Sequence, residues 1–151
     1  MSPPRLRPLT RGPAPARRPP AGDLELLRQG YQRSGGLVTA DALLLALRRS
    51  SSQPLSLLAR WIVERRVLSL SLAGQTLLPR FQFGALASGL KPGLEPAMAE
   101  LAPVFDDGEL LQWWARANSA LGGAAPADRL DRQPDEVRQA ARLDRFIASG
   151  G

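Results

Sequence analysis

The stretch VLSLSLAGQTLLPRFQF, residues 67–83, departs from the helical pattern on either side of it and decides the fold class. Its apolar residues alternate with polar ones before a short turn and recur after it, at Leu68, Leu70, Leu72, Leu77, Phe81 and Phe83. A period of two is typical of a strand with one buried face, and Ala73–Gly74 suits a tight turn. The stretch therefore predicts a β-hairpin. Pro79 has no amide hydrogen to donate, which predicts that the second strand is an edge strand.

The segment on the N-terminal side of the hairpin has the spacing of short helices. A first helix is predicted to begin at Asp23 and end at Gly35–Gly36, and a second to be capped by Thr39. Pro54 begins a third helix, because proline suits the first helical position. The inward residues predicted for the second and third helices are Leu43, Leu44, Leu47, Leu55, Leu58, Ala59, Ile62 and Val63. Residues 23–83 are thus predicted to form a helix-turn-helix-like subdomain, with the hairpin as a wing or a dimer strand.

Residues 84–151 are predicted to form a helical domain. A helix that ends at Pro103 is followed by one that Asp106 or Asp107 caps. Pro134 opens the last helix. The apolar positions of that helix are Val137, Ala140, Ala141, Phe146 and Ile147. The fold class predicted for the chain is therefore mainly α, with one β-hairpin.

Cysteine and histidine are both missing from the 151 residues. Their absence excludes disulfides, thiolate or imidazole metal sites and nucleophiles activated by histidine. The chain also lacks a glycine-rich phosphate loop and the common hydrolase motifs. We therefore expect no catalytic residue, no cofactor and no metal, and a protein that is not an enzyme.

The sequence also bears on location. No apolar run approaches the roughly 20 residues of a membrane span. The first residues, MSPPRLRPLTRG, lack the hydrophobic stretch of a secretory signal. The expected location is therefore the cytoplasm, without contact to a membrane.

Positive charge is concentrated in the first half of the chain. Residues 1–22 hold seven prolines, five arginines and no acidic residue, and are predicted to be a disordered tail. Residues 23–66 carry seven arginines against four acidic residues, whereas residues 67–151 carry eight basic against ten acidic ones. This asymmetry favours two surfaces with different partners, of which the basic one could meet nucleic acid. Alternatively, arginine merely replaces lysine, since 19 of the 20 basic residues are arginine.

Arg60, Arg65 and Arg66 lie near the end of the predicted third helix and are candidates for contacts with DNA phosphates. The alternative is that three arginines at a helix end complement the helix dipole and need no partner. The helix is apolar where a base-reading helix should be polar, which weighs against sequence-specific DNA binding.

A second informative stretch is WWARANSALGGAAP, residues 113–126. Trp113 and Trp114 point about 100° apart on a helix. One is therefore predicted to lie in the core and the other at its edge, where a large aromatic can anchor a partner. Asn118 is predicted to close the turn by binding the backbone. The residues assigned structural roles in turns are Gly122, Gly123, Pro126, Pro79 and Gln82.

Two stretches together resemble a known family. RVLSLSLAGQTLLPRFQF resembles a hairpin that ends in Pro-x-x-Gln-Phe. WWARANSALGGAAPADRL…VRQAAR resembles a Trp/Phe–Asn–x-x-Leu–Gly–Gly–x-x-Pro pattern followed by a Val-x-x-Ala helix. In this order they look like the Xre/MbcA/ParS-type antitoxins, including their toxin-binding C-terminal domain. The resemblance covers residues 67–148 well and residues 37–66 loosely, and the family often has proline where this chain has Ala117.

The resemblance implies a small cytoplasmic type II antitoxin that pairs with a toxin attacking NAD, commonly a RES-domain protein. The C-terminal domain would bind the toxin and cover its active site, and a helix-turn-helix could repress the operon. We also expect a homodimer, since helix-turn-helix proteins read paired half-sites. The residues predicted to contact the toxin are Trp113, Trp114, Asn118, Leu121, Arg142, Arg145 and Phe146.

Alternatives stay open for these residues and for the whole chain. Arg138, Arg142 and Arg145 form a basic stripe that could meet an acidic toxin surface or pair with acids nearby. The end FIASGG is predicted to be flexible, with Phe146 as a plug for the partner's cleft. The chain could instead be a stand-alone DNA-binding regulator whose C-terminal domain mediates dimerisation. It could also be an adaptor that kept the fold without a toxin.

Overall fold

The computed structural model describes residues 21–85 and 89–150 and is mainly helical, with one small antiparallel sheet. The α-helices are α1 (Ala21–Tyr31), α2 (Ala40–Leu47), α3 (Pro54–Val63), α4 (Leu94–Leu101), α5 (Asp107–Ala115), α6 (Pro126–Arg129) and α7 (Pro134–Ala148). The short 3-10 helices are η1 (Gln32–Ser34), η2 (Arg80–Gln82) and η4 (Ser119–Leu121). The strands are β1 (Leu37–Thr39), β2 (Leu70–Leu72) and β3 (Gln75–Pro79). The mainly-α fold class is therefore confirmed.

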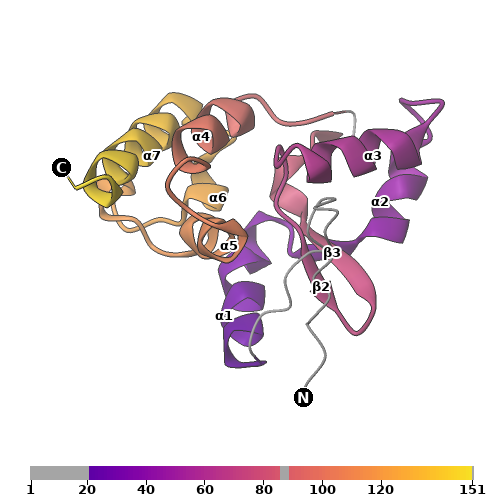
Figure 1. Ribbon diagram of the computed structural model, residues 1–151, viewed down its shortest axis with the longest axis horizontal. Helices are drawn as coiled ribbons and strands as arrows, with labels where there is room; N and C mark the ends of the chain where they lie inside the picture. Colours follow the sequence, from indigo (N-terminus) through magenta and orange to yellow (C-terminus); the bar gives the residue numbers. More distant parts are fainter. Residues whose placement is uncertain (1–20, 86–88, 151) are drawn as a thin grey trace, which may run out of the picture.

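The helices fall into two groups. Figure 1 shows α4 to α7 at one end of the molecule and α2, α3 and the sheet at the other, with α1 between them. The tail predicted over residues 1–22 lies outside the described residues up to residue 20, and Ala21 and Gly22 belong to α1.

The predicted hairpin is present, but it belongs to a sheet of three strands. Ala73 and Gly74 have φ angles of 51° and 79°, the left-handed pair that a two-residue hairpin turn requires. The strand order is β1-β3-β2, so β3 is the central strand and the prediction that Pro79 marks an edge strand is wrong. Proline is tolerated because it is the last residue of β3, opposite Leu37, and the next amide, that of Arg80, bonds to Gly36 O at 2.9 Å.

β1 was not predicted, because three residues are too short to show a period. The predicted cap does form after it: the Thr39 hydroxyl accepts a hydrogen bond from Ala42 N at 3.1 Å. The inward face predicted for α3 is partly wrong. Leu58 and Trp61 are buried, whereas Leu55, Ala59 and Val63 are exposed, because only a narrow side of α3 faces the core.

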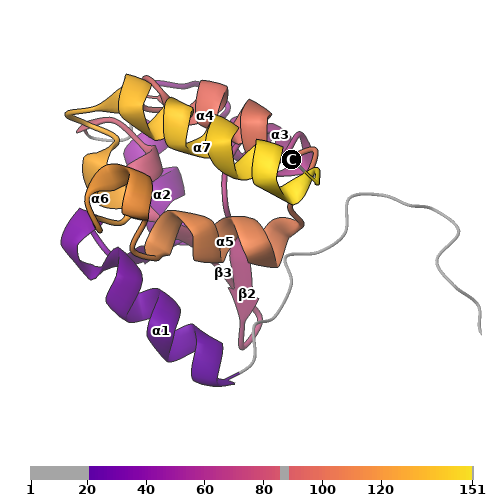
Figure 2. The ribbon, with the colours of Figure 1, turned by 90° about the vertical axis from the view of Figure 1, so that its left-hand side faces the viewer.

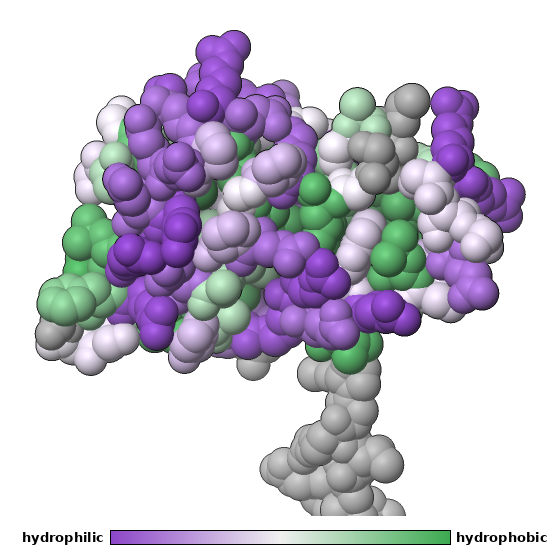
Figure 3. All heavy atoms as spheres, turned by 90° about the horizontal axis from the view of Figure 1, so that it is seen from above, coloured by the Kyte–Doolittle hydropathy of each residue, from purple (hydrophilic) through white to green (hydrophobic). Residues whose placement is uncertain are grey.

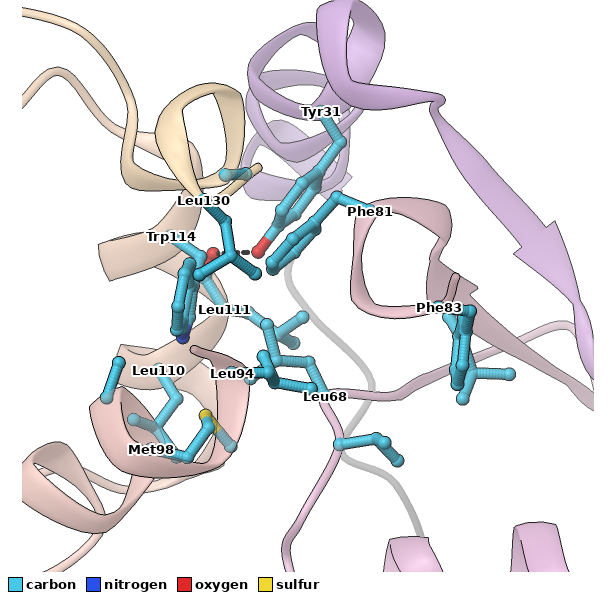
Figure 4. Close-up of a cluster of buried hydrophobic side chains, with 14 of the residues drawn as sticks. Tyr31, Leu68, Phe81, Phe83, Leu94, Met98, Leu110, Leu111, Trp114 and Leu130 are labelled. Carbon is cyan, nitrogen blue, oxygen red and sulfur yellow. Dashed lines mark hydrogen bonds between the residues drawn. The ribbon is translucent and has the colours of Figure 1, made fainter. Parts of the chain in front are cut away.

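One continuous core joins residues from both predicted parts of the chain. Tyr31 of α1 stacks on Phe81 with ring centroids 5.8 Å apart, and Phe81 packs on Trp114 of α5 at 5.0 Å. The Tyr31 hydroxyl donates to Leu111 O at 2.5 Å, as Figure 4 shows. Burial raises the pKa of this phenol well above its usual value. The first helix is therefore fixed against the second half of the chain.

Gln82 fastens the hairpin to the rest of the structure. Its side chain is fully buried, and its Oε1 accepts from Leu68 N at 2.5 Å. Its Nε2 donates to Leu68 O and to Pro79 O, both at 3.1 Å. One amide group thus satisfies three backbone groups that the sheet leaves without partners.

Candidate protein-binding site

Helix α5 begins with a capping box and carries the tryptophan pair near its C-terminal end. Asp106 Oδ1 accepts from Glu109 N at 2.8 Å, and Glu109 Oε1 accepts from Asp106 N at 2.9 Å. Trp114 points inward and has no exposed surface, which corrects the prediction that it contacts a toxin. Its neighbour Trp113 is half-buried and meets Trp114 edge to face at 5.1 Å. Trp113 is therefore the indole at the edge of the core.

Asp144 of α7 connects Trp113 to the turn that follows α5. Its Oδ2 accepts from Trp113 Nε1 at 2.6 Å and from Asn118 Nδ2 at 3.4 Å. Asn118 Oδ1 also accepts from Ala120 N at 2.9 Å and caps η4. Asn118 is thus engaged inside the chain. Nothing in the sequence analysis singled out Asp144, because its two partners lie 31 and 26 residues away.

The turn after η4 depends on two exposed glycines. Gly122 and Gly123 have φ angles of 66° and 88°, and each would leave a Cβ in open space. The constraint is therefore the backbone angle and not a lack of room. Pro126 is the first residue of α6. Leu121, 6% exposed, lies in the core, which corrects its predicted role as a surface contact.

The C-terminal half of α7 exposes an apolar strip. Val137, Ala140 and Ala141 face the core, whereas Leu143, Phe146 and Ile147 are 49%, 61% and 62% exposed. We call these last three residues the α7 strip. At spacings of three and one they occupy one side of the helix. Residues 146–148, predicted to belong to a flexible end, are helical.

Figure 3 shows hydrophobic surface at the end of the molecule where α7 terminates, next to strongly hydrophilic surface. Figure 2 looks at this end and shows α7 alongside α4, above α5. The strip therefore lies at an accessible extremity of the fold.

Next to the strip, this half of α7 is basic and is partly neutralised by Glu100 of α4. Glu100 Oε1 accepts from Arg142 Nη2 at 3.2 Å, and Oε2 accepts from Arg145 Nη1 at 3.1 Å. The two arginine side chains are 62% and 48% exposed, whereas that of Glu100 is 11% exposed. Of the two interpretations of the basic stripe, pairing with a nearby acid thus applies to Arg142 and Arg145.

Glu100 makes the stability of this helix pair dependent on pH. The hydrogen bond from Arg145, followed by that from Arg142, lowers the pKa of Glu100 against the opposing effect of burial. A lowered folded-state pKa stabilises the fold above the unfolded value of about 4.3, and this stabilisation is lost as the pH falls through the folded-state pKa. Glu100→Gln should therefore lower the free energy of unfolding at pH 7, and its gap to wild type should narrow as the pH falls below about 4.3.

Urea denaturation at pH 7 and at pH 3 measures this gap. Glu25→Gln, the same change at an exposed position of α1, is the control and should show almost no gap at either pH. An equal gap at pH 7 and pH 3 for Glu100→Gln would contradict the assignment.

A cavity of about 350 Å³ lies between α5, η4 and α7. Its lining includes Trp113, Asn118 and Asp144 together with Phe105, Glu109, Gln112, Arg116, Ala117 and Ser119. Ile147 of the strip follows Asp144 by three residues, so both lie on the same side of α7. The cavity therefore lies on the side of α7 that carries Ile147.

A larger cavity, of about 610 Å³, lies where α1 and η1 meet α6. Its lining carries both signs of charge, from Arg33, Lys91, Arg129, Asp128 and Asp131. None of the residues predicted to contact a toxin lines it.

The three arginines assigned to DNA differ in their surroundings. Arg65 donates to Asp107 Oδ1 at 2.9 Å and to Phe105 O at 3.0 Å, and Arg66 to Glu95 Oε1 at 2.6 Å. The hydrogen bond to Glu95 raises the pKa of Arg66. Both arginines hold the end of α3 to the second half of the chain. Their side chains stay 40% and 38% exposed, so contact with phosphates remains a prediction. Arg60 is exposed and pairs with no acidic residue within the described ranges.

Comparisons with models of protein families, with curated proteins and with solved structures find no match for this chain. Within the described residues, no helix is both long enough and apolar enough to cross a membrane. The same residues contain no group of three or more acidic side chains placed to hold a metal ion.

Proposed function

We propose that the chain is the antitoxin of a type II toxin–antitoxin pair and that it acts in the cytoplasm. It binds a toxin that attacks NAD, a RES-domain protein by the resemblance of residues 67–148, and covers the toxin's active site. In this proposal the chain is a homodimer that can also bind operator DNA and repress its own synthesis. The proposal requires no chemistry from the chain itself.

The α7 strip is the observation that carries this proposal. Leu143, Phe146 and Ile147 are exposed on a helix whose opposite face already completes the core. Adjacent exposed apolar residues are typical of a protein-binding surface, and large side chains at its centre contribute most of the affinity. The partly exposed Arg142 and Arg145 flank the strip and supply the polar rim such interfaces have.

Removing single side chains from the strip should weaken toxin binding without affecting the fold. Phe146→Ala and Ile147→Ala are each expected to raise the dissociation constant roughly 10- to 100-fold, the effect of losing a central interface residue. Calorimetric titration with the toxin, which the proposal expects to be a RES-domain protein encoded beside the gene, measures the constant, and circular dichroism checks the helices. Leu45→Ala, on α2 and 62% exposed like Ile147, is the matched control and should bind as wild type.

Two results would refute the assignment of this surface. One is wild-type affinity in both strip variants. The other is equal weakening by Leu45→Ala, because binding would then not be located on α7. If the toxin is fully active in the presence of excess wild-type chain, the antitoxin proposal itself is wrong.

A stand-alone DNA-binding regulator is the second candidate. It is favoured by the order β1, α2, α3, β2, β3, in which two helices precede a hairpin as in a helix-turn-helix with a wing, and by the exposed Arg60. The exposed Leu55 and Val63 on the outer face of α3 weigh against base reading. A gel-shift titration with the upstream region of the gene is the test. If Arg60→Ala leaves both the affinity and its salt dependence unchanged, α3 does not contact phosphates.

A further inference from the structure

We propose that the cavity between α5, η4 and α7 receives a cationic side chain, an arginine or a lysine, of the bound partner. This inference rests on the proposed function only for the identity of that partner. The chemistry of the cavity is a property of this chain and can be tested without the toxin.

Asp144 supplies a carboxylate oxygen whose position is fixed. Its Oδ2 is held by the indole of Trp113 and the amide of Asn118. Its Oδ1 accepts no hydrogen bond from any residue in the described part of the chain. The carboxylate is partly withdrawn from water and lines the cavity. A charge-assisted hydrogen bond from a guanidinium or ammonium group would satisfy the remaining oxygen.

Aromatic rings form another part of the wall. Trp113 and Phe105 both line the cavity. The edge-to-face contact with the buried Trp114 holds the Trp113 ring in place. An indole ring attracts a cation through its quadrupole, and the attraction is stronger where water is partly excluded. The volume of about 350 Å³ is at the lower end for a ligand site and is large enough to admit a whole arginine or lysine side chain.

The charges of the lining agree with a cationic occupant. Glu109 and Asp144 contribute two negative charges against the single positive charge of Arg116, on a chain whose net charge is +6. The cavity is therefore a local negative site on a positive protein. Because Ile147 lies on the same side of α7 as Asp144, the partner would present a basic residue next to apolar ones.

The test uses N-acetyl-arginine amide as a probe of the cavity, with the neutral isostere N-acetyl-citrulline amide as its comparison. Two-dimensional NMR of the full-length chain follows the indole Nε1 resonance of Trp113, which Trp113→Phe identifies. The arginine probe should shift this resonance with a dissociation constant in the millimolar range, since one side chain makes few contacts. The citrulline probe should bind at least about ten-fold more weakly, because it lacks the charge.

Two substitutions that each remove one negative charge complete the experiment. Asp144→Asn keeps an oxygen that can accept a hydrogen bond from the indole, and it should raise the dissociation constant of the arginine probe at least about five-fold. Asp135→Asn, at an exposed position in the first turn of the same helix, should leave the dissociation constant of the arginine probe unchanged. Equal binding of the two probes, or unchanged binding to Asp144→Asn, would overturn the inference. Arginine binding without inhibition of any toxin would leave the cavity assignment intact and remove the antitoxin function.

Discussion

Trp114→Ala should lower the free energy of unfolding by about 3–5 kcal/mol, the usual loss when a large aromatic is removed from a packed core. Trp114 has no exposed surface, and its ring contacts Phe81 at 5.0 Å and Trp113 at 5.1 Å. A domain of this size is typically stable by about 5–15 kcal/mol, so the variant should be partly unfolded or melt on the order of 10 °C lower. Urea and thermal denaturation followed by circular dichroism measure the change.

The matched control for this prediction is Phe146→Ala. It removes an aromatic side chain that is 61% exposed, so the free energy of unfolding should change by less than about 0.5 kcal/mol. Trp114→Phe provides a second comparison. It keeps most of the ring contacts and removes an indole N–H that has no hydrogen-bond partner among the described residues, so it should cost clearly less than alanine. A loss below about 1 kcal/mol for Trp114→Ala would show that this side chain does not hold the core together.

Gln82→Leu should lower the free energy of unfolding by a similar amount, because it removes hydrogen bonds to buried backbone groups. The substitution preserves volume but leaves Leu68 N, Leu68 O and Pro79 O buried without their side-chain partner. Each unsatisfied group costs about 1–3 kcal/mol, so a total loss of roughly 3 kcal/mol or more is expected. Gln75→Leu makes the same change at an exposed position of β3 and should stay within about 0.5 kcal/mol of wild type.

Gln82→Glu adds a pH signature to the same site. An ionised carboxylate cannot donate to the two carbonyls, so the site favours the protonated acid and raises the pKa of the introduced carboxyl above about 4.3. A raised acid pKa means that the folded state holds its proton more tightly, and stability falls as the pH rises from about 4.3 through the folded-state pKa. Denaturation from pH 4 to pH 8 should show this decline relative to wild type. A flat difference would contradict the role of Gln82 as a donor.

The tryptophan pair and Asp144 show how far the sequence could predict the functional surface. That one of the adjacent tryptophans is core and the other peripheral follows from helix geometry alone. Which one is buried depends on where Phe81 and Tyr31 place the core relative to α5, and neither of these residues is local to the pair. For the same reason Asp144 was missed, because its role exists only once α7 lies against η4 and α5.

Arg65 and Arg66 illustrate the same limit for charged residues. Their position near a helix end suggested phosphate contacts or a dipole effect. Their partners Asp107 and Glu95 lie 42 and 29 residues further along the chain. Only the packing of the end of α3 against α4 and the start of α5 decides that these arginines hold two parts of one molecule together.

The sequence by itself determined the features whose causes are local. These are the hairpin with its Ala73–Gly74 turn, the cap at Thr39 and the helix starts at Pro54, Pro126 and Pro134. A dihedral preference, a cap or a missing amide hydrogen acts within a few residues, so it can be predicted from the residue types nearby in the sequence. The tertiary structure decided the pairing of β1 with β3, the burial of Trp114 and the exposure of the α7 strip. Burial and ion pairing depend on groups brought together from distant parts of the chain, and a local sequence pattern does not show which of these groups will be in contact.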